Sequence, residues 1–488
     1  MANVTIVGGG LAGMTAALRL LERGLEVSLY ESTARLGGKA GADKNGDDYN
    51  DHGYHIFPAW YLNIWRLVEE LGIRGNFVDL VRLNQINSDE FPKFTTLEGI
   101  TSLRNAVKNL RAGFIPIPDM ILFLYAVLDL ASQPYSQRAS LDQISATGFL
   151  RSRFYKTERL EEQFHELMLK AITVPAYNVS AMTVKNVMQF WLKYPLPVVR
   201  ILKGNLQTFF IDPIQQKLKT LACNLHFQKH LVRIETEGSR VTRLHFRDTR
   251  TDVVMEKEVD QFILAIPADK VAKLIDDELY AAAPELANVQ YLHSQPMVSL
   301  DVYLRRKIPE LPSEHVNLTG ARFGLSLLDV SNVWSGYEKT VLNLIASDFH
   351  PLQTLTREQA VEILMDEIRR FLPIESNDVE RYVFQPHAHE PLLLNDLGAW
   401  HFRPEATTEL DNMFLAGDYC RSPVDLVSME AAVLSGLKAA EALRLKRNIG
   451  HPVEILEPEV HPEWLLRLGR YLLTPIALLA KVTTLVRR

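Results

Sequence analysis

The alternation of apolar and polar positions predicts a strand, a helix and a second strand at the start of the chain. Residues 4–7 form a short apolar run, residues 11–23 repeat apolar positions at helical spacing, and residues 26–30 have the pattern of another strand. Gly24 follows the helical pattern, where a left-handed C-cap favours glycine. The pattern is that of a parallel βαβ unit.

Between about residues 59 and 216 the pattern becomes helical. Apolar positions recur at helical spacing over residues 62–71, 120–130 and 160–172, and prolines stand in the turns between them. This predicts an inserted, mostly helical region. Strand patterns then return: residues 225–234 and 240–246 predict a hairpin around Glu237-Gly238-Ser239. Further strands are predicted at 253–259, 262–266, 297–304, 323–330, 341–346 and 413–416, and helices at 357–371 and 428–445.

Composition narrows the class of protein. The chain has 488 residues, 47% of them hydrophobic, which fits a globular protein of about two to three domains. Its 53 Lys+Arg and 59 Asp+Glu give a net charge of −6, so no nucleic-acid partner is expected. The only cysteines, Cys223 and Cys420, exclude a disulfide framework and favour a reducing, cytoplasmic location. Neither a secretion signal nor a membrane-spanning helix is expected.

Gly8, Gly10 and Gly13 form the pattern G-x-G-x-x-G directly after the first strand and at the start of the helix. Glycines there permit a tight turn and let backbone N–H groups approach a pyrophosphate. Glu31 ends the second strand, where a carboxylate can accept hydrogen bonds from a ribose diol. Together these features predict a dinucleotide site.

A second glycine turn, Arg35-Leu36-Gly37-Gly38-Lys39, follows the acid. A nicotinamide domain has no need of it, whereas a longer flavin dinucleotide does. With these blocks the chain resembles the FAD-dependent amine-oxidase-like superfamily, and more closely the carotenoid desaturases of the phytoene and ζ-carotene type. The resemblance extends to Asp51-His52-Gly53-Tyr54-His55-Ile56-Phe57, to residues 61–64, and to the closing blocks 414–418 and 428–436. Two places depart from the family pattern. Ala431 stands where many relatives have glycine, and Lys203-Gly204-Asn205 has a single glycine where the usual turn has two.

The resemblance implies an α/β fold: a Rossmann-like FAD domain of the two-dinucleotide-binding type and a discontinuous, mixed and largely helical substrate domain. The expected segments are three FAD-binding parts at 1–90, 216–290 and 401–450, a helical substrate or membrane region at 91–215, a substrate domain at 291–400 and an amphipathic tail at 451–488.

The resemblance also implies a set of FAD-binding residues. They are Gly8, Gly10, Leu11, Ala12, Gly13, Glu31, Ser32, Arg35, Gly38, Lys39, Gly53, Tyr54, His55, Val232, Gly417, Asp418 and Met429. Asp418 would bind ribityl or phosphate-side hydroxyls, the helix after Ser428 would face the flavin pyrimidine ring, and the backbone of Val232 would meet the adenine, a plain core valine being the alternative.

Asp51, His52 and His55 invite a catalytic role, since histidine titrates near neutrality. Removing hydrogen from an unactivated C–H bond needs an electron sink more than a base, and the flavin supplies it. His55 is therefore the catalytic candidate, with a structural or flavin-packing role as the preferred alternative. His387-Ala388-His389-Glu390 lacks a remote cluster to complete a metal site, so no metal is expected.

The C-terminus has an amphipathic pattern. A mostly polar stripe lies opposite an apolar face that includes Leu465, Leu468, Leu472, Ile476 and Leu479; the stripe consists of Glu463, Arg467, Arg470, Thr474, Ala477, Lys481, Thr484 and Arg488. This predicts an interfacial helix, kinked at Pro475, that binds a membrane surface, or a terminal helix docked on the protein's own core. Residues 114–128 form a second apolar stretch, a membrane-dipping entrance or core.

The leading functional hypothesis is an FAD-dependent desaturase that transfers hydride from a long apolar isoprenoid or polyene to the flavin, with a membrane quinone as acceptor. A redox-neutral polyene isomerase, a squalene-pathway dehydroxylase, an amine or porphyrinogen oxidase, and a non-catalytic lipid-binding flavoprotein are the alternatives.

Overall fold

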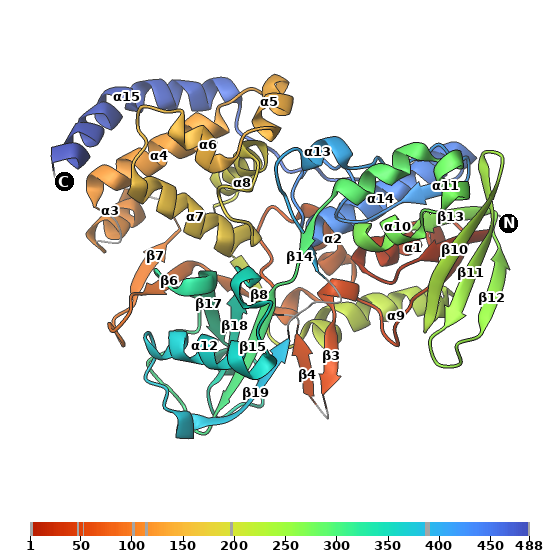
Figure 1. Ribbon diagram of the computed structural model, residues 1–488, viewed down its shortest axis with the longest axis horizontal. Coiled ribbons are helices and arrows are strands. Elements are labelled where there is room, and N and C mark those ends of the chain that lie inside the picture. The colour runs from red at the N-terminus through yellow and green to blue at the C-terminus, as the bar shows by residue number, and fades with distance from the viewer. Residues whose placement is uncertain are drawn as a thin grey trace.

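The computed structural model describes residues 3–45, 48–51, 53–99, 103–112, 116–195, 199–385 and 391–486. Figure 1 shows three parts: a parallel sheet flanked by helices, a larger mixed sheet, and a bundle of helices. The N-terminal end lies in the first part and the C-terminal end at the outer edge of the bundle. The predicted α/β class is confirmed.

The parallel sheet gathers strands from three distant stretches of the chain. Its order is β21-β13-β1-β2-β9, and every pairing is parallel. The strands are β1 (Asn3–Val7), β2 (Glu26–Tyr30), β9 (Asn224–His226), β13 (Gln261–Leu264) and β21 (Met413–Leu415). Helices cover the sheet, so β1, β2, β13 and β21 are almost entirely buried and show no polar alternation, whereas the edge strand β9 is partly exposed.

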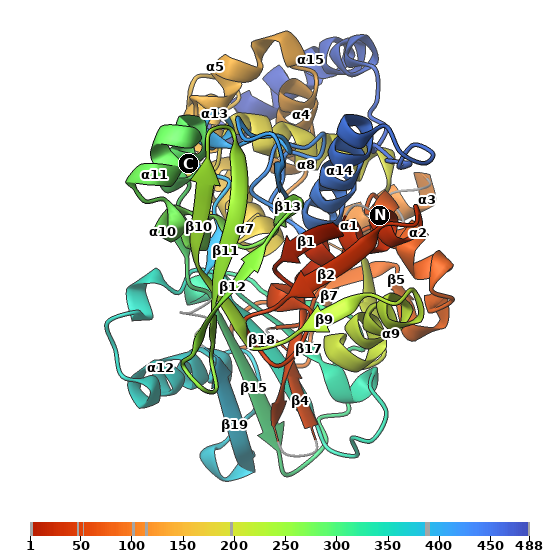
Figure 2. The ribbon, with the colours of Figure 1, turned by 90° about the vertical axis from the view of Figure 1, so that its right-hand side faces the viewer.

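Two helices pack together beside this sheet. α1 (Leu11–Leu21) connects β1 to β2, which confirms the predicted βαβ unit, and Gly24 has the expected left-handed φ of 76°. α14 (Met429–Arg447) follows β21 and lies beside α1 (Figure 2).

The predicted hairpin exists, with one correction. β10 (Lys229–Glu237) and β11 (Arg240–Asp248) pair antiparallel, and β12 (Val254–Glu258) adds a third strand. The single strand predicted at residues 225–234 is wrong, because the chain turns at Gln228, whose φ is 58°. The part before that turn joins the parallel sheet as β9.

A seven-stranded sheet of order β19-β15-β18-β17-β16-β6-β7 forms the second part. Its strands are β6 (Arg82–Ile86), β7 (Thr95–Glu98), β15 (Val298–Leu304), β16 (Val316–Leu318), β17 (Leu325–Asp329), β18 (Val341–Ala346) and β19 (Val379–Gln385). Apolar side chains of β15, β17 and β18 pack against α12 (Arg357–Arg369), as Val298, Leu325, Leu344 and Leu364 show.

β6 and β7 were not expected, because residues 59–216 were predicted to be mostly helical. β6 pairs parallel with β16, which lies more than two hundred residues later in the chain. The domain boundary placed at residue 90 stays a prediction, but this pairing joins residues 82–86 to the seven-stranded sheet.

Three of the helices predicted for this region exist: α4 (Ile117–Ala131) and α7 (Glu158–Ile172) in the helical bundle, and α2 (Leu62–Glu70), which packs beside α14 near the parallel sheet. α15 (Glu463–Val486) lies along α4 (Figure 1), although more than three hundred residues separate them. The other helices of the bundle are α3 (Leu103–Arg111), α5 (Arg138–Asp142), α6 (Ala146–Arg151) and α8 (Ala181–Lys193). Elsewhere lie α9 (Asp212–Thr220), α10 (Ala268–Leu274), α11 (Asp277–Ala282), α13 (Ala399–Phe402), β3 (Ala42–Asn45), β4 (Asp48–Asp51), β5 (Phe77–Leu80), β8 (Val199–Leu202), β14 (Ser294–Gln295) and β20 (Leu392–Leu393).

Candidate flavin site

The glycine turn between β1 and α1 is closely packed on one side and open on the other. A Cβ on Gly8 would lie 2.2 Å from the carbonyl oxygen of Ala265, and a Cβ on Gly13 would lie 1.9 Å from that of Gly8. A Cβ on Gly10 would meet nothing within 4 Å. Gly8 and Gly13 are therefore needed for packing, whereas Gly10 borders open space.

The first turn of α1 presents unpaired donors at this open side. Leu11, Ala12 and Gly13 are buried, yet their backbone N–H groups have no hydrogen-bond partner among the described residues. The N-cap, Gly10, offers no side-chain acceptor, and no acidic residue occupies the first turn. Such a helix N-terminus favours an anion, so it fits the pyrophosphate of a dinucleotide.

Glu31, at the end of β2, is tied to the glycine turn. Its Oε2 accepts a hydrogen bond of 2.8 Å from the backbone N–H of Gly9, and its Oε1 accepts from the N–H of Thr33 at 2.8 Å and the hydroxyl of Ser32 at 3.1 Å. The carboxylate therefore holds the turn in place, in addition to the ribose contact predicted for it.

The second glycine turn touches the first. Gly37 has a φ of 116° and donates its N–H to the carbonyl of Gly9 at 2.9 Å, and a Cβ on Gly38 would lie 3.3 Å from the Cα of Gly10. Arg35 donates to Asp43 Oδ1 at 2.7 and 2.9 Å, and so braces this turn.

Lys39, the last residue of this turn, is partly buried, and its side chain has no hydrogen bond or ion pair to any described residue. The two turns form one continuous surface, which fits a ligand longer than a single nucleotide.

The segment after β4 lies on the seven-stranded sheet. Gly53 has a φ of 96°, and the N–H of Tyr54 donates to Asn343 Oδ1 at 3.0 Å. The Tyr54 hydroxyl lies 2.8 Å from Ser326 Oγ. His55 Nδ1 donates to the carbonyl of Gly53 at 2.9 Å, which fixes the ring on its own turn. The catalytic role of His55 stays a prediction.

Two buried carboxyl groups lie beneath this segment. Asp301 of β15 accepts a hydrogen bond from Asn343 Nδ2 at 2.5 Å, and burial raises its pKa to about 7. Burial also raises the pKa of Asp51 well above its usual range, although the N–H of Leu206 donates to Asp51 Oδ1 at 2.9 Å. Sequence reasoning missed Asp301; a lone acid within the apolar run Val298–Leu304 was the available signal.

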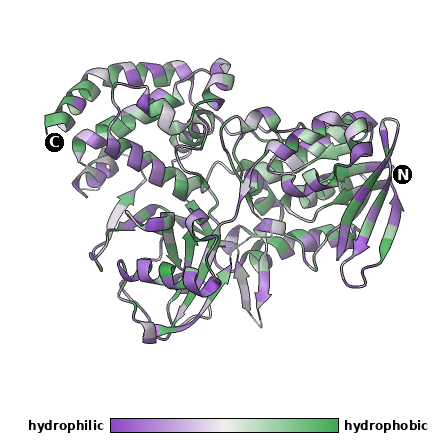
Figure 3. Cartoon of the chain, viewed as in Figure 1, coloured by the Kyte–Doolittle hydropathy of each residue, from purple (hydrophilic) through white to green (hydrophobic). Residues whose placement is uncertain are grey.

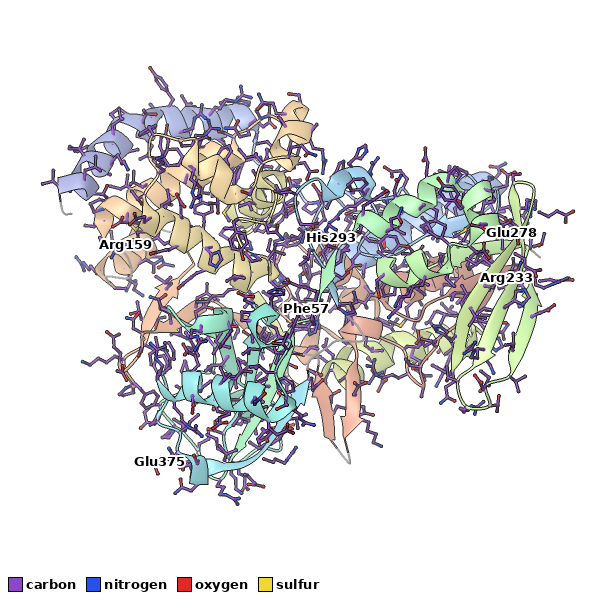
Figure 4. All side chains as sticks on the ribbon, in the orientation of Figure 1. Phe57, Arg159, Arg233, Glu278, His293 and Glu375 are labelled. Atoms are coloured by element: carbon purple, nitrogen blue, oxygen red, sulfur yellow. The ribbon has the colours of Figure 1, made fainter. Side chains whose placement is uncertain are left out.

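Phe57 ends this segment near the centre of the molecule (Figure 4). Its ring is fully buried and lies edge-on against Trp65, Phe77 and Phe210. This aromatic cluster anchors the segment on its side away from the sheet.

The closing motif after β21 contributes a carboxylate and a helix end. The Gly417 N–H donates to Ser435 Oγ at 2.8 Å, and Asp418 is half-buried without a hydrogen-bond or ion-pair partner in the described part of the chain. Ser428 Oγ caps α14 by accepting from the N–H of Ala431 at 3.2 Å. The backbone N–H of Met429 is unpaired among the described residues. This end of α14 can therefore stabilise negative charge on a bound ring.

Val232 occupies a bulge in β10. The pairing with β11 shifts between Leu231 and Arg233, so Val232 has no opposite residue there. β10 is also the edge of its sheet, so the backbone of Val232 is available to a ligand, as its predicted adenine contact requires.

Some candidates fall elsewhere. His52 and residues 386–390, which include the His387-Ala388-His389-Glu390 segment, lie outside the described residues. Within the described ranges, no three His, Cys, Asp or Glu side chains gather as a metal site.

α15 docks on the bundle through its polar stripe. Arg470 forms an ion pair with the buried Asp129 of α4, the hydroxyls of Thr474 and Tyr125 lie 3.2 Å apart, and Ala477 is fully buried. α15 therefore docks on the protein's own core, as the alternative prediction stated, and the polar stripe takes part in this contact together with Leu466 and Ala480. Binding of a membrane surface by the other side of the helix stays a prediction.

α15 runs along the outer edge of the bundle (Figure 3), and the exposures of its residues show that its apolar side faces outward. Leu472 is 66% exposed and Leu479 is 68% exposed. The other exposed apolar residues of this face are Trp464, Leu465, Leu468, Tyr471, Ile476, Leu478, Val482, Leu485 and Val486. A contiguous exposed apolar face of this kind marks an interaction surface.

The basic side chains of Arg470 and Lys481 donate to protein acceptors. α15 is continuous from Glu463 to Val486 with Pro475 inside it, so the kink predicted there stays a prediction. On α4, Ile117 and Leu124 are exposed, while residues 114–115 lie outside the described ranges. Among the helices that the structure describes, none combines the length and the apolar character needed to cross a membrane.

Comparison with known proteins agrees with this geometry. The family of flavin containing amine oxidoreductases matches residues 11–444. The chain is 23% identical to a zeta-carotene desaturase of Synechocystis sp., over 90% of this chain and 97% of that protein. It is 24% identical to a 15-cis-phytoene desaturase of Synechococcus elongatus, over 91% and 96%. A putrescine oxidase with bound putrescine has the same fold, with a TM-score of 0.68, 15% identity and coverage of 92% and 98%.

The chain belongs to the flavin containing amine oxidoreductase family and is carotenoid-desaturase-like within it. It is an FAD-dependent oxidoreductase, and the glycine turns and the unpaired N–H groups of α1 fit the pyrophosphate of this cofactor.

Proposed function

We propose that this family member desaturates a long apolar isoprenoid or polyene, which it takes from the surface of a membrane. When bound, FAD would supply the electron sink: the substrate would lose two hydrogens from adjacent carbons, one as hydride to the flavin and one as a proton released to solvent, and would gain a double bond. A membrane quinone, reduced to the quinol, is the proposed final acceptor. The names of the relatives over nine-tenths of the chain support this class of substrate.

The observation that carries the proposal is the orientation of α15. A helix that docks through Arg470 and Thr474 and leaves Leu472 and Leu479 exposed can enter the boundary between lipid headgroups and acyl chains. A substrate that dissolves only in lipid requires such contact, whereas a water-soluble amine does not.

In this proposal the protein binds, orients and excludes water. The unpaired N–H groups of α1 hold the pyrophosphate, and Glu31 fixes the turn around it. The N-terminus of α14 at Met429 would face the flavin ring and would favour its reduced, negatively charged form. His55, tied to the carbonyl of Gly53, positions the ring or the substrate without transferring a proton.

Anaerobic mixing tests the chemistry. The purified protein is combined in turn with phytoene, ζ-carotene, a hydroxylated triterpene, a primary amine and a porphyrinogen, and the flavin absorbance and product mass are followed. Bleaching by one polyene with a product two hydrogens lighter supports the proposal. A product of unchanged mass indicates isomerisation, and loss of a hydroxyl group indicates dehydroxylation. Bleaching of the flavin only by the amine or only by the porphyrinogen would indicate an amine oxidase or a porphyrinogen oxidase instead.

Vesicle flotation tests the membrane contact. A Leu472→Asp, Leu479→Asp double variant should lose binding to vesicles of phosphatidylcholine with phosphatidylglycerol, because the charges oppose insertion. Val254→Asp, a change of an exposed residue on β12 at the other end of the molecule, is the matched control and should bind like the wild type. Equal flotation of all three proteins contradicts the membrane part of the proposal.

A further inference from the structure

Glu430, the second residue of α14, is fully buried and accepts three hydrogen bonds from α2. Its Oε1 accepts from the backbone N–H of Asn63 at 2.9 Å and from Asn63 Nδ2 at 2.7 Å. Its Oε2 accepts from the backbone N–H of Ile64 at 3.0 Å. The side chain therefore points away from its own helix and satisfies the first turn of another.

The two helices meet end to end at this carboxylate. Tyr61, the N-cap of α2, provides no side-chain acceptor, so Glu430 takes that part. α14 is capped separately by Ser428, which leaves the N–H groups of Met429 and Glu430 without a partner among the described residues. One buried carboxylate thus sits between the positive end of α2 and the end of α14 that faces the proposed flavin.

Asn63 connects this junction to the segment that leads to α15. Its side chain donates to the carbonyl of Leu456 at 2.8 Å and accepts from the N–H of Leu456 at 3.0 Å. The position of the α14 N-terminus is therefore fixed by α2 and by the C-terminal segment together.

We propose that Glu430 is a positioning residue for the flavin, which holds the first turn of α14 in place and, when ionised, lowers the reduction potential of the bound FAD. A negative charge one residue from Met429 opposes the negative charge that the flavin gains on reduction. The inference rests on the proposed position of the flavin at this helix end, but not on the identity of the substrate.

The charge on Glu430 varies near neutral pH. Burial raises its pKa to about 7, against the opposing effect of the three N–H donors. The groups that face it are neutral near this pH: Asn63 and Ile64 of α2, and Tyr61, whose pKa burial raises far above neutrality. Glu430 is therefore mostly ionised at pH 8.5 and mostly protonated at pH 5.5.

The reduction potential of the bound flavin, measured against reference dyes, tests the inference. Glu430→Gln should shift the potential upward at pH 8.5, and the two proteins should converge at pH 5.5, where the wild-type carboxyl is neutral. Glu441→Gln is the control, since Glu441 lies on the same helix and accepts from Arg444 and the N–H of Val453, far from the flavin end. It should leave the potential unchanged. Equal potentials at pH 8.5, or the same shift at both pH values, would overturn the inference.

If Glu430→Gln loses the flavin, the variant Asn63→Ala tests the inference instead. Asn63→Ala keeps the carboxylate but removes one donor, which makes ionisation less favourable. The pH at which the potential changes slope should therefore move upward relative to the wild type, and an unchanged profile would contradict the proposal. These titrations need no substrate, so a flavin that no isoprenoid reduces would defeat the proposed function while leaving this inference standing.

Discussion

Gly436 of α14 lies against the backbone of Ala12 in α1, so closely that a Cβ on Gly436 would come within 2.2 Å of the Ala12 carbonyl oxygen. The two helices whose N-termini are assigned to the flavin therefore touch through backbone, without a side chain between them. Their separation sets how far the pyrophosphate end of the site lies from the ring end.

Gly436→Ala should destabilise the protein by about 1–3 kcal/mol, because the helices must move apart to admit one methyl group. The change should also weaken flavin retention, since both helix ends shift. Chemical denaturation and flavin release on dilution measure the two effects. Gly469→Ala in α15 is the control: its Cβ would have only an ordinary contact of 3.9 Å with Leu128. Equal losses of stability and of flavin retention in the two variants would show that the close α1–α14 contact does not cause the effect of Gly436→Ala.

Gly10→Leu should separate flavin binding from folding. Gly10 has an ordinary φ of −74° and open space beside it, so a larger side chain fits the apoprotein but occupies the place expected for the pyrophosphate. The variant should be purified colourless with a nearly unchanged melting temperature. Gly75→Leu, at an exposed glycine with similar space, should stay yellow. A yellow Gly10→Leu protein would contradict the assignment of this turn.

The local parts of the fold could be predicted because their signals are local. The glycine spacing and the apolar runs of residues 4–30 define the first βαβ unit, and the turn around Gly238 defines the hairpin. β6 could not be found in this way, since its partner β16 lies far along the chain and its sequence, Arg82–Ile86, has two polar side chains, Asn84 and Gln85, that the sheet buries. The pairing, not the residue pattern, makes it a strand.

The candidate site, like the fold, could be predicted from the sequence only in part. The motif residues Gly10 and Glu31 could be named from the sequence, but the hydrogen bond from Gly9 to Glu31 depends on how the turn folds back. The amphipathic pattern of α15 was clear, yet it could not reveal which side docks. That choice depends on Asp129, which lies on α4 and is distant in sequence.

Asp301 should make stability fall as the pH rises. Its pKa is raised to about 7 in the folded protein, so the folded state binds the proton more tightly than the unfolded state. The stabilisation from this proton is complete below about pH 4 and is lost as the pH rises through 7. Asp301→Asn keeps an acceptor for Asn343 and should flatten this decline in the free energy of unfolding.

Burial lowers the pKa of His315 to about 4, so the folded state binds this proton less tightly than the unfolded state. Below pH 6.5 this makes stability rise with pH, opposite to the effect of Asp301. The stability of the wild type must therefore be compared with that of Asp301→Asn at each pH. Parallel stability curves for the two proteins between pH 4 and 8 would contradict the assignment of a protonated Asp301.

Asp129→Ala should loosen α15. The Asp129 carboxylate accepts from the Tyr155 hydroxyl at 2.7 Å and pairs with Arg470 and Arg153. Its removal leaves buried donors unsatisfied, at a cost on the order of 2 kcal/mol. Limited proteolysis should then cut faster within residues 449–462. Asp366→Ala, which breaks an exposed pair with Arg369, should change neither measurement by much.

His55→Ala should lower turnover only modestly, by about tenfold or less, because general acid–base catalysis contributes a hundredfold or more and is not expected of this residue. His55 Nδ1 is held by the Gly53 carbonyl, so the lost function is the orientation of a turn that Asn343 also secures. The profile of kcat against pH should keep the wild-type shape. Asp418→Ala, in contrast, should act through loss of flavin, and added FAD should partly restore it. A loss of a hundredfold or more in His55→Ala with full flavin content, together with a vanished inflection in the pH profile, would instead make His55 a proton-transfer group, because mere misorientation of the turn cannot remove a titration from the rate.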